Sequence, residues 1–131
     1  AKLGDRFTAT FSVRSSVNAE KEGLITKLKE LADFYNGTYS QSGTYPAWEF
    51  KKDSRLRDVM VPIYTRMFGK EPKVLAIHAG LECGLLGDKL PGLDCVSIGP
   101  QMHDIHTSRE KLEIASTKRT WDFLLEVLKA L

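Results

Sequence analysis

Residues 73–84 read KVLAIHAGLECG, and residues 93–106 read LDCVSIGPQMHDIH. In each run a short apolar stretch leads into a turn that carries glycine together with acidic or imidazole side chains. Apolar stretches of this length are typical of buried strands, and open α/β folds hold their ligands where such strands end. The two runs therefore predict an α/β fold with a functional site at one edge of its sheet.

The composition is that of a single domain without a strongly charged surface. The chain has 131 residues, 19 basic and 17 acidic side chains and a formal net charge of +2. A domain of this size can bury roughly two thirds of its unfolded surface. Because the two signs of charge are mixed along the chain, the basic face expected of proteins that bind nucleic acid or anionic membranes is excluded. We expect a small-molecule partner.

The cysteine content and the hydropathy indicate a cytoplasmic protein. Cys83 and Cys95 have neither CxxC spacing nor the pattern of a disulfide-rich domain, which is typical of a reducing compartment. No apolar run reaches the roughly eighteen residues of a membrane span, and the first residues lack the apolar core of a signal peptide.

The first third of the chain is predicted to form a strand, a helix and a second strand. Residues 7–14 alternate between apolar and polar side chains, as a half-buried strand does. Residues 18–35 place apolar side chains at helical spacing, with Asn18 as the N-cap and Asn36 at the stop. The Tyr, Thr and Ser content of residues 38–48 favours the second strand.

The charged segment at residues 49–53 is interpreted as a linker between two structural units. A helix is predicted to begin there with Asp53 as its cap and to end at Gly69. Nearer the C-terminus, residues 111–114 are consistent with a short strand, and Ser116 is the expected cap of a last amphipathic helix.

Three residues in these segments are candidates for ligand binding. His106 follows a Gly-Pro turn, where a neutral imidazole can hold a metal, although most loop histidines bond only to water or backbone. Glu82 lies beside glycines, which suits a substrate-binding carboxylate and an ordinary surface turn equally. Arg14 has the planar fork that takes a carboxylate in two parallel hydrogen bonds, although most such arginines are simply solvated. His103 is interpreted as an outer partner of the metal site or a surface residue.

The motifs KVLAIHAGLECG, LDCVSIGP and WDFLLEVL resemble the C-terminal part of the aminoacyl-histidine dipeptidases, the Xaa-His dipeptidases of the co-catalytic zinc peptidase superfamily. Members have a two-zinc catalytic domain that is interrupted by a smaller lid domain. The resemblance implies that residues 1–48 are the closing strand, helix and strand of the lid. It implies that residues 49–131 return into the catalytic domain, a mixed sheet with flanking helices.

The resemblance also assigns site residues. His106 matches the C-terminal zinc ligand, Arg14 in SVRSS matches the lid arginine that binds the substrate carboxylate, and Glu82 with Gly80 matches the loop that lines the substrate pocket. The turn after the histidine departs from the family pattern but retains Glu110. The remaining zinc ligands and the general base belong to the N-terminal half of the family, so no catalytic residue is assigned in this chain.

The implied function is hydrolysis of Xaa-His dipeptides such as β-alanyl-histidine by an enzyme with two zinc ions, which forms a homodimer through its lid. The 131-residue chain alone is expected to be inactive. A tripeptidase or N-deacylase of the same superfamily is an alternative, and a small non-catalytic binding or dimerisation module is another. A His-x-Asp motif upstream in the same reading frame would favour the enzyme.

Overall fold

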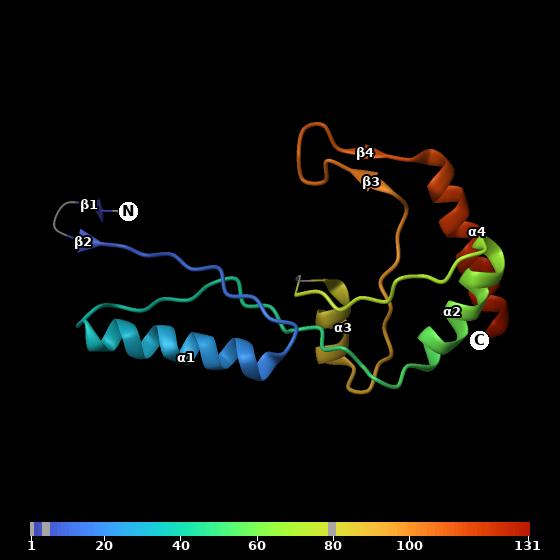
Figure 1. Cartoon of the computed structure of the whole chain (residues 1–131). Helices are drawn as coiled ribbons and strands as arrows, with labels where there is room; N and C mark the ends of the chain where they lie inside the picture. The colour runs from blue at the N-terminus through green and yellow to red at the C-terminus, as the bar shows by residue number, and fades with distance from the viewer. Residues whose placement is uncertain (1, 4–5, 79–80) are drawn as a thin grey trace. The chain divides into compact units, whose positions relative to one another are not determined.

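The structure is a computed structural model that describes residues 2–3, 6–78 and 81–131. The chain divides into two compact units (Figure 1). Unit 1 comprises residues 1–50 and 76–88, and unit 2 comprises residues 51–75 and 89–131. Helices and short strands both occur, which confirms the predicted α/β content. The assignment of these segments to a lid and a catalytic domain stays a prediction.

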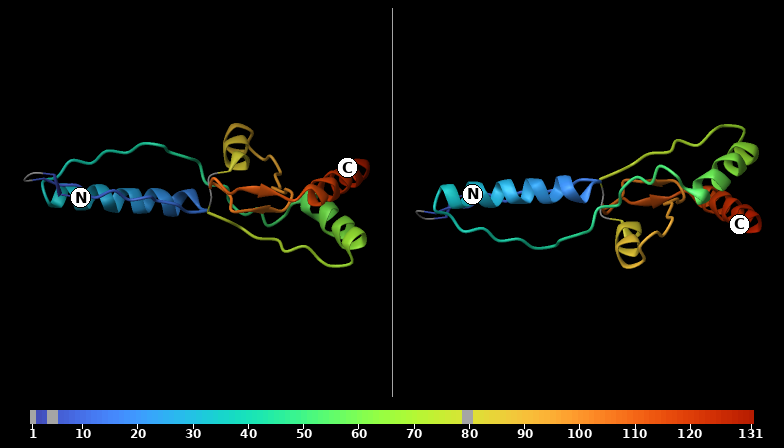
Figure 2. Two further views of the ribbon diagram at one scale, coloured as in Figure 1. Left: turned by 90° about the horizontal axis from the view of Figure 1, so that it is seen from above. Right: turned by 90° about the horizontal axis from the view of Figure 1, so that it is seen from below.

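Unit 1 is built around helix α1, Asn18–Phe34. A two-residue ladder precedes it, in which β1, Lys2–Leu3, pairs antiparallel with β2, Arg6–Phe7. The segments on either side of α1 run back along the length of the helix (Figures 1 and 2). Helix α3, Glu82–Lys89, begins in this unit.

Unit 2 contains α2, Arg55–Phe68, and α4, Ile114–Ala130, which pack against each other. Between them in sequence lies a second ladder, in which β3, Met102–His103, pairs antiparallel with β4, Lys111–Leu112. In the described part of the chain, no helix combines the length and the apolar character that crossing a membrane requires.

The three long helices confirm the helices predicted from the sequence, but their caps differ. Val17 rather than Asn18 precedes α1 and makes no side-chain cap bond. Ser54 rather than Asp53 caps α2, with its hydroxyl accepting from the Arg57 backbone N–H at 3.1 Å. Because several polar residues precede each helix, the periodic pattern alone leaves the first helical residue uncertain by a few positions.

The N-cap prediction was also wrong at α4, whereas the predicted C-terminal stop of α2 at Gly69 was right. Glu113 precedes α4, and Ser116 lies inside its first turn. The buried Ser116 hydroxyl accepts from the Gln101 backbone N–H at 2.8 Å and donates to the Glu113 carbonyl at 2.7 Å. Ser116 therefore connects the residue before β3 to the first turn of α4. Gly69 ends α2 in the left-handed conformation with φ 68°.

The strands predicted at residues 38–48, 74–77 and 95–98 were wrong, because these segments have no regular structure. Of the strand predicted at residues 7–14, only Phe7 lies in a strand, β2. Their apolar side chains remain accessible, with Phe11 62% and Leu75 72% exposed. A strand is stable only when neighbouring strands satisfy its backbone groups. Within the described ranges, the β1–β2 and β3–β4 pairs are the only ladders, so these segments lack such neighbours.

Asn18 fixes the start of α1 to the segment that follows the helix. Its side-chain oxygen accepts from the Ala47 backbone N–H at 2.8 Å and from the Lys21 ammonium at 3.3 Å. The backbone N–H of Asn18 donates to the Glu49 carboxylate at 2.9 Å. Lys21 is buried despite its charge and also donates to the Tyr45 carbonyl. Polar contacts therefore hold residues 45–49 against the first turn of α1.

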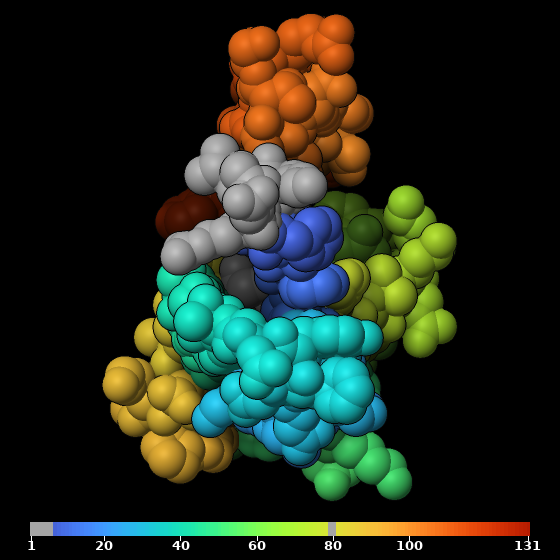
Figure 3. All heavy atoms as spheres, turned by 90° about the vertical axis from the view of Figure 1, so that its left-hand side faces the viewer, coloured from blue at the N-terminus to red at the C-terminus, as the bar shows by residue number. Residues whose placement is uncertain are grey.

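The other end of α1 is open to solvent. Phe34 and Tyr35 form an edge-to-face pair with ring centroids 5.0 Å apart, and they are 76% and 73% exposed. In the space-filling view the end of α1 and the residues after it, in cyan, lie at the surface (Figure 3). Apolar packing inside unit 1 is accordingly sparse.

The hydrophobic core lies in unit 2, between α2 and α4. Its buried members among the described residues are Met60 and Ile63 from α2 with Phe123 and Val127 from α4. Phe123 stands edge-to-face on Tyr64, with ring centroids 5.5 Å apart. Aromatic pairs of this kind contribute about 0.5–1.5 kcal/mol beyond the area they bury. The α2–α4 pair is therefore the best-packed part of the chain.

Asp94 caps α2 from a distant part of the sequence. Its carboxylate accepts from the Leu56 backbone N–H at 2.9 Å and from the Ser54 hydroxyl at 2.7 Å. The Leu56 hydrogen bond is the main cause that lowers the pKa of Asp94, and partial burial opposes it. The Ser54 hydroxyl and the charge of Lys51 lower the pKa further. An anion at this position also suits the positive end of the helix dipole.

Asp94→Asn is expected to lower the free energy of unfolding at pH 7 by about 1 kcal/mol, the usual cost of a lost helix cap. Because the pKa of Asp94 is depressed in the folded state, its stabilisation is complete above the unfolded-state pKa and is lost as the pH falls through the folded-state value. Urea unfolding should therefore show a difference that shrinks in acid. Asp53→Asn is the matched control and should match the wild type. A deficit that persists in acid would contradict the ionic cap.

Candidate functional site

His106 lies in the loop that joins β3 to β4. The ladder pairs Met102 with Leu112 and His103 with Lys111, so residues 104–110 form the loop. At the base, the Glu113 backbone N–H donates to the Gln101 carbonyl at 3.0 Å. The His106 side chain is exposed, and no hydrogen bond of its ring appears among the described residues. An accessible imidazole of this kind fits a metal ligand and a solvated loop histidine alike.

The backbone of this loop is in an uncommon conformation. His106 has φ 67° and Asp104 has φ 50°, both in the left-handed region. A residue with a Cβ atom loses about 1–2 kcal/mol there, so the surrounding contacts must favour it.

Several hydrogen bonds brace the loop. The Thr107 hydroxyl donates to the Asp104 carbonyl at 2.7 Å, and the Glu110 backbone N–H donates to the Thr107 carbonyl at 3.2 Å. The Glu110 carboxylate accepts from the His106 backbone N–H at 2.9 Å. The His106 backbone is thus held by a side chain four residues later.

Glu82 is the first residue of α3, which corrects the prediction that it lies in a glycine turn. Its side chain is exposed. The sequence indicated a turn because Gly80 and Gly84 flank Glu82 and glycine has low helix propensity. An acidic residue in the first turn also favours the helix through its dipole. Gly80, assigned to the same loop, lies outside the described residues.

Gly84 allows α3 to approach the chain segment before it. A Cβ atom at this position would lie 3.0 Å from the Pro46 carbonyl oxygen and 3.5 Å from the Trp48 Cβ. Gly84 is buried, and a side chain there would push against backbone. The absence of a side chain at Gly84 therefore allows α3, which begins at Glu82, to lie close to residues 46–48.

Arg14 is exposed and lies in the irregular segment before α1 rather than on a strand. In the ranges that the structure covers, its guanidinium makes no hydrogen bond or ion pair. The next residue begins the entry to the helix, since the Ser15 hydroxyl accepts from the Val17 backbone N–H at 3.1 Å and donates to Glu20 at 3.0 Å. The five donors of Arg14 are accordingly accessible to a ligand.

The candidate residues are divided between the two units. Arg14 and Glu82 belong to unit 1, whereas His106 belongs to unit 2. Across the described ranges, no three His, Cys, Asp or Glu side chains gather as metal ligands would. A zinc centre needs about three protein ligands. His106 fits one ligand position by its chemistry and exposure, and the other positions would need ligands from elsewhere.

Sequence reasoning did not predict the contacts of Asp94 and Gly84 or the bond from His106 to Glu110. The first two depend on segments that meet only in the folded chain. The third had a local signal, since a carboxylate four residues after a loop histidine can turn back to its amide.

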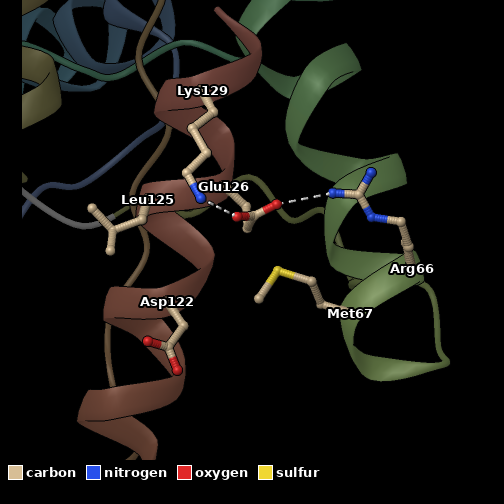
Figure 4. A pocket seen from close by; sticks show the side chains of 6 residues that line it. All are labelled: Arg66, Met67, Asp122, Leu125, Glu126 and Lys129. Atoms are coloured by element: carbon tan, nitrogen blue, oxygen red, sulfur yellow. Dashed lines mark hydrogen bonds and ion pairs between the residues drawn. The ribbon is translucent and has the colours of Figure 1, made fainter.

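An open groove between α2 and α4 is a second feature of unit 2 (Figure 4). The Glu126 carboxylate lies between Lys129 at 2.7 Å and Arg66 at 3.3 Å. The Lys129 hydrogen bond and charge are the largest causes of the lowered pKa of Glu126. The groove contains none of the residues that the sequence singled out, and its exposed ion pairs suit a solvated surface.

Comparison with known proteins identifies relatives of the chain, although no family model matches it. It is 34% identical over 117 residues to the cytosol non-specific dipeptidase of Escherichia coli (strain K12), which covers 89% of this chain and 24% of that protein. The crystal structure of aminoacylhistidine dipeptidase from Vibrio alginolyticus matches with a TM-score of 0.77 and 31% identity, over 89% of this chain and 24% of that one.

The chain is homologous to a segment of these dipeptidases. The resemblance predicted from the three motifs is thereby confirmed. The chain spans about a quarter of the length of the relatives it matches, since each alignment covers 24% of the relative. The structural match extends the similarity from sequence to fold, so the α/β character of this dipeptidase homologue has independent support.

Proposed function

We propose that this chain is part of a zinc-dependent dipeptidase that hydrolyses Xaa-His dipeptides such as β-alanyl-histidine in the cytoplasm. The observation that carries the proposal is the similarity over 89% of the chain to two dipeptidases, one of them named for aminoacyl-histidine substrates and the other as cytosolic. One relative is named a non-specific dipeptidase and the other an aminoacylhistidine dipeptidase. Dipeptide hydrolysis is therefore the broader part of the proposal, and the preference for histidine is the narrower part.

In this proposal the residues of the chain bind and orient, and they do not carry the proton transfer. His106 holds one of two zinc ions through its imidazole, and its exposure in the β3–β4 loop supports that role. Arg14 binds the substrate carboxylate through its guanidinium, which has no hydrogen-bond or ion-pair partner among the described residues. Glu82 and Gly80 line the substrate pocket. When bound, the zinc ions would polarise the scissile carbonyl and lower the pKa of a bound water to about 7.

The remaining ligands and the general base are proposed to lie outside these 131 residues, and the partner in assembly to be a second copy joined through the lid. Two alternatives make different predictions. A tripeptidase or N-deacylase of the same superfamily would keep the zinc dependence and change the substrate. A non-catalytic binding or dimerisation module would show no hydrolysis at all.

The test is a dipeptidase assay on the whole natural protein. We expect hydrolysis of β-alanyl-histidine that is lost with a chelator and restored by zinc, together with weaker use of a tripeptide and an N-acyl amino acid. The 131-residue chain alone should be inactive, because one zinc ligand cannot hold a hydrolytic centre. Metal-independent hydrolysis, or activity of the isolated chain, would contradict the proposal.

A further inference from the structure

The direction of the His106 side chain depends on its backbone. At φ 67° the Cα–Cβ bond points elsewhere than it would in the extended or helical conformations that most residues adopt. A metal ligand must be held close to its productive geometry by the groups around it. Whatever favours the left-handed conformation of His106 therefore also sets where its imidazole is presented.

The direct side-chain contact to this backbone comes from Glu110. Its carboxylate accepts the His106 N–H at 2.9 Å. Glu110 immediately precedes β4 and donates its own N–H to the Thr107 carbonyl at 3.2 Å, so its position is fixed from both sides. The side chain is exposed, yet it turns back onto the loop. A charged acceptor makes this bond stronger than a neutral one.

We infer that Glu110 is the positioning residue for His106: it holds the left-handed loop backbone that presents the imidazole to its metal. The inference rests on the proposed role of His106 and extends it to a residue that makes no contact with the metal. Loss of an outer partner of a metal ligand typically costs 10–100-fold in metal affinity. Because the partner here acts on the backbone and not on the ring, we expect a loss of about tenfold.

The experiment compares three glutamate variants of the whole natural protein by zinc competition with a chromophoric chelator. Glu110→Ala should weaken zinc binding by about tenfold. Glu110→Gln keeps an oxygen acceptor and should restore most of the affinity. Glu71→Ala, at an exposed glutamate whose side chain makes no hydrogen bond or ion pair in the described ranges, should bind zinc as the wild type does.

Amide hydrogen exchange of the metal-free protein gives a second readout that does not involve zinc. The peptide containing His106 should exchange faster in Glu110→Ala than in the wild type, and Glu110→Gln should restore the protection.

His106→Ala separates the proposed zinc-ligand role of His106 from the proposed positioning role of Glu110. If it loses zinc while Glu110→Ala keeps the full affinity, the positioning role alone is overturned. If it keeps all its zinc, the proposed ligand and its positioning residue both fall. Equal losses in the Ala and Gln variants would also overturn the inference.

Discussion

His106→Ala is expected to abolish zinc-dependent dipeptide hydrolysis by the whole natural protein and to lower its zinc content. The reason is that a site with about three protein ligands seldom tolerates the loss of one. The loop that carries His106 is exposed and closed by the short β3–β4 ladder, so removal of the imidazole should leave the fold intact. Metal analysis and turnover of β-alanyl-histidine would measure the effect.

His103→Ala is the comparison variant, because the chain has a second exposed imidazole three residues away. A much smaller loss than in His106→Ala is expected, since His103 is interpreted as an outer partner of the metal site or a surface residue. His103 lies within β3, where its backbone pairs with Lys111. A substitution there removes an imidazole of the same size as the test variant does. Normal zinc content and turnover in His106→Ala, combined with a loss in His103→Ala, would show that the other histidine is the ligand.

The helices could be predicted from the sequence because their signal is local. The stripe of apolar residues at 3.6-residue spacing and the stop at Gly69 or Asn36 lie within each helical segment. The amide of each residue bonds inside the same element, so little outside information is needed. Helix α3 was not predicted, because its glycines are typical of a turn. The reason for Gly84 is visible only in the structure, where α3 lies close to residues 46–48.

The short strand predicted at residues 111–114 is confirmed by β4. The other predicted strands were wrong, because a strand bonds to residues that are distant in sequence. The apolar stretch before His78 has the composition of a buried strand, yet residues 74–77 form no ladder here. Alternation and apolar runs report which face a segment would bury, not whether a neighbouring strand is present. The relatives are about four times longer than the 131-residue chain, since the chain covers 24% of each of them.

The candidate site shows the same difference between features that the sequence states locally and contacts that only the folded chain reveals. His106 and Arg14 could be named from residue type and motif, because accessible imidazole and guanidinium groups have a chemistry that the sequence states directly. The contact that supports the His106 backbone could not, because Glu110 acts through a loop conformation with positive φ. The Asp94 cap of α2 was missed for a different reason, since it lies 38 positions from Leu56 in the sequence.

Arg14→Ala in the whole natural protein is expected to lower kcat/KM for a dipeptide by about tenfold or more, because a charge-assisted hydrogen bond contributes about 1.5–3 kcal/mol. The guanidinium of Arg14 makes no hydrogen bond or ion pair within the described ranges, so its loss removes no such bond and should leave the stability unchanged. Lys29→Ala, at an exposed cation on α1, is the matched control for the loss of one positive charge.

The substrate decides whether Arg14 acts on the carboxylate. A C-terminally amidated dipeptide lacks the anion that the guanidinium is proposed to bind, so Arg14→Ala should change its kcat/KM little. The ratio of acid to amide kcat/KM should therefore fall by about tenfold in the variant and stay constant in Lys29→Ala. Arg14→Lys keeps the charge but not the two parallel bonds, and its ratio should lie between the two. Equal losses on both substrates would make Arg14 a structural residue, and the carboxylate would have to be bound elsewhere.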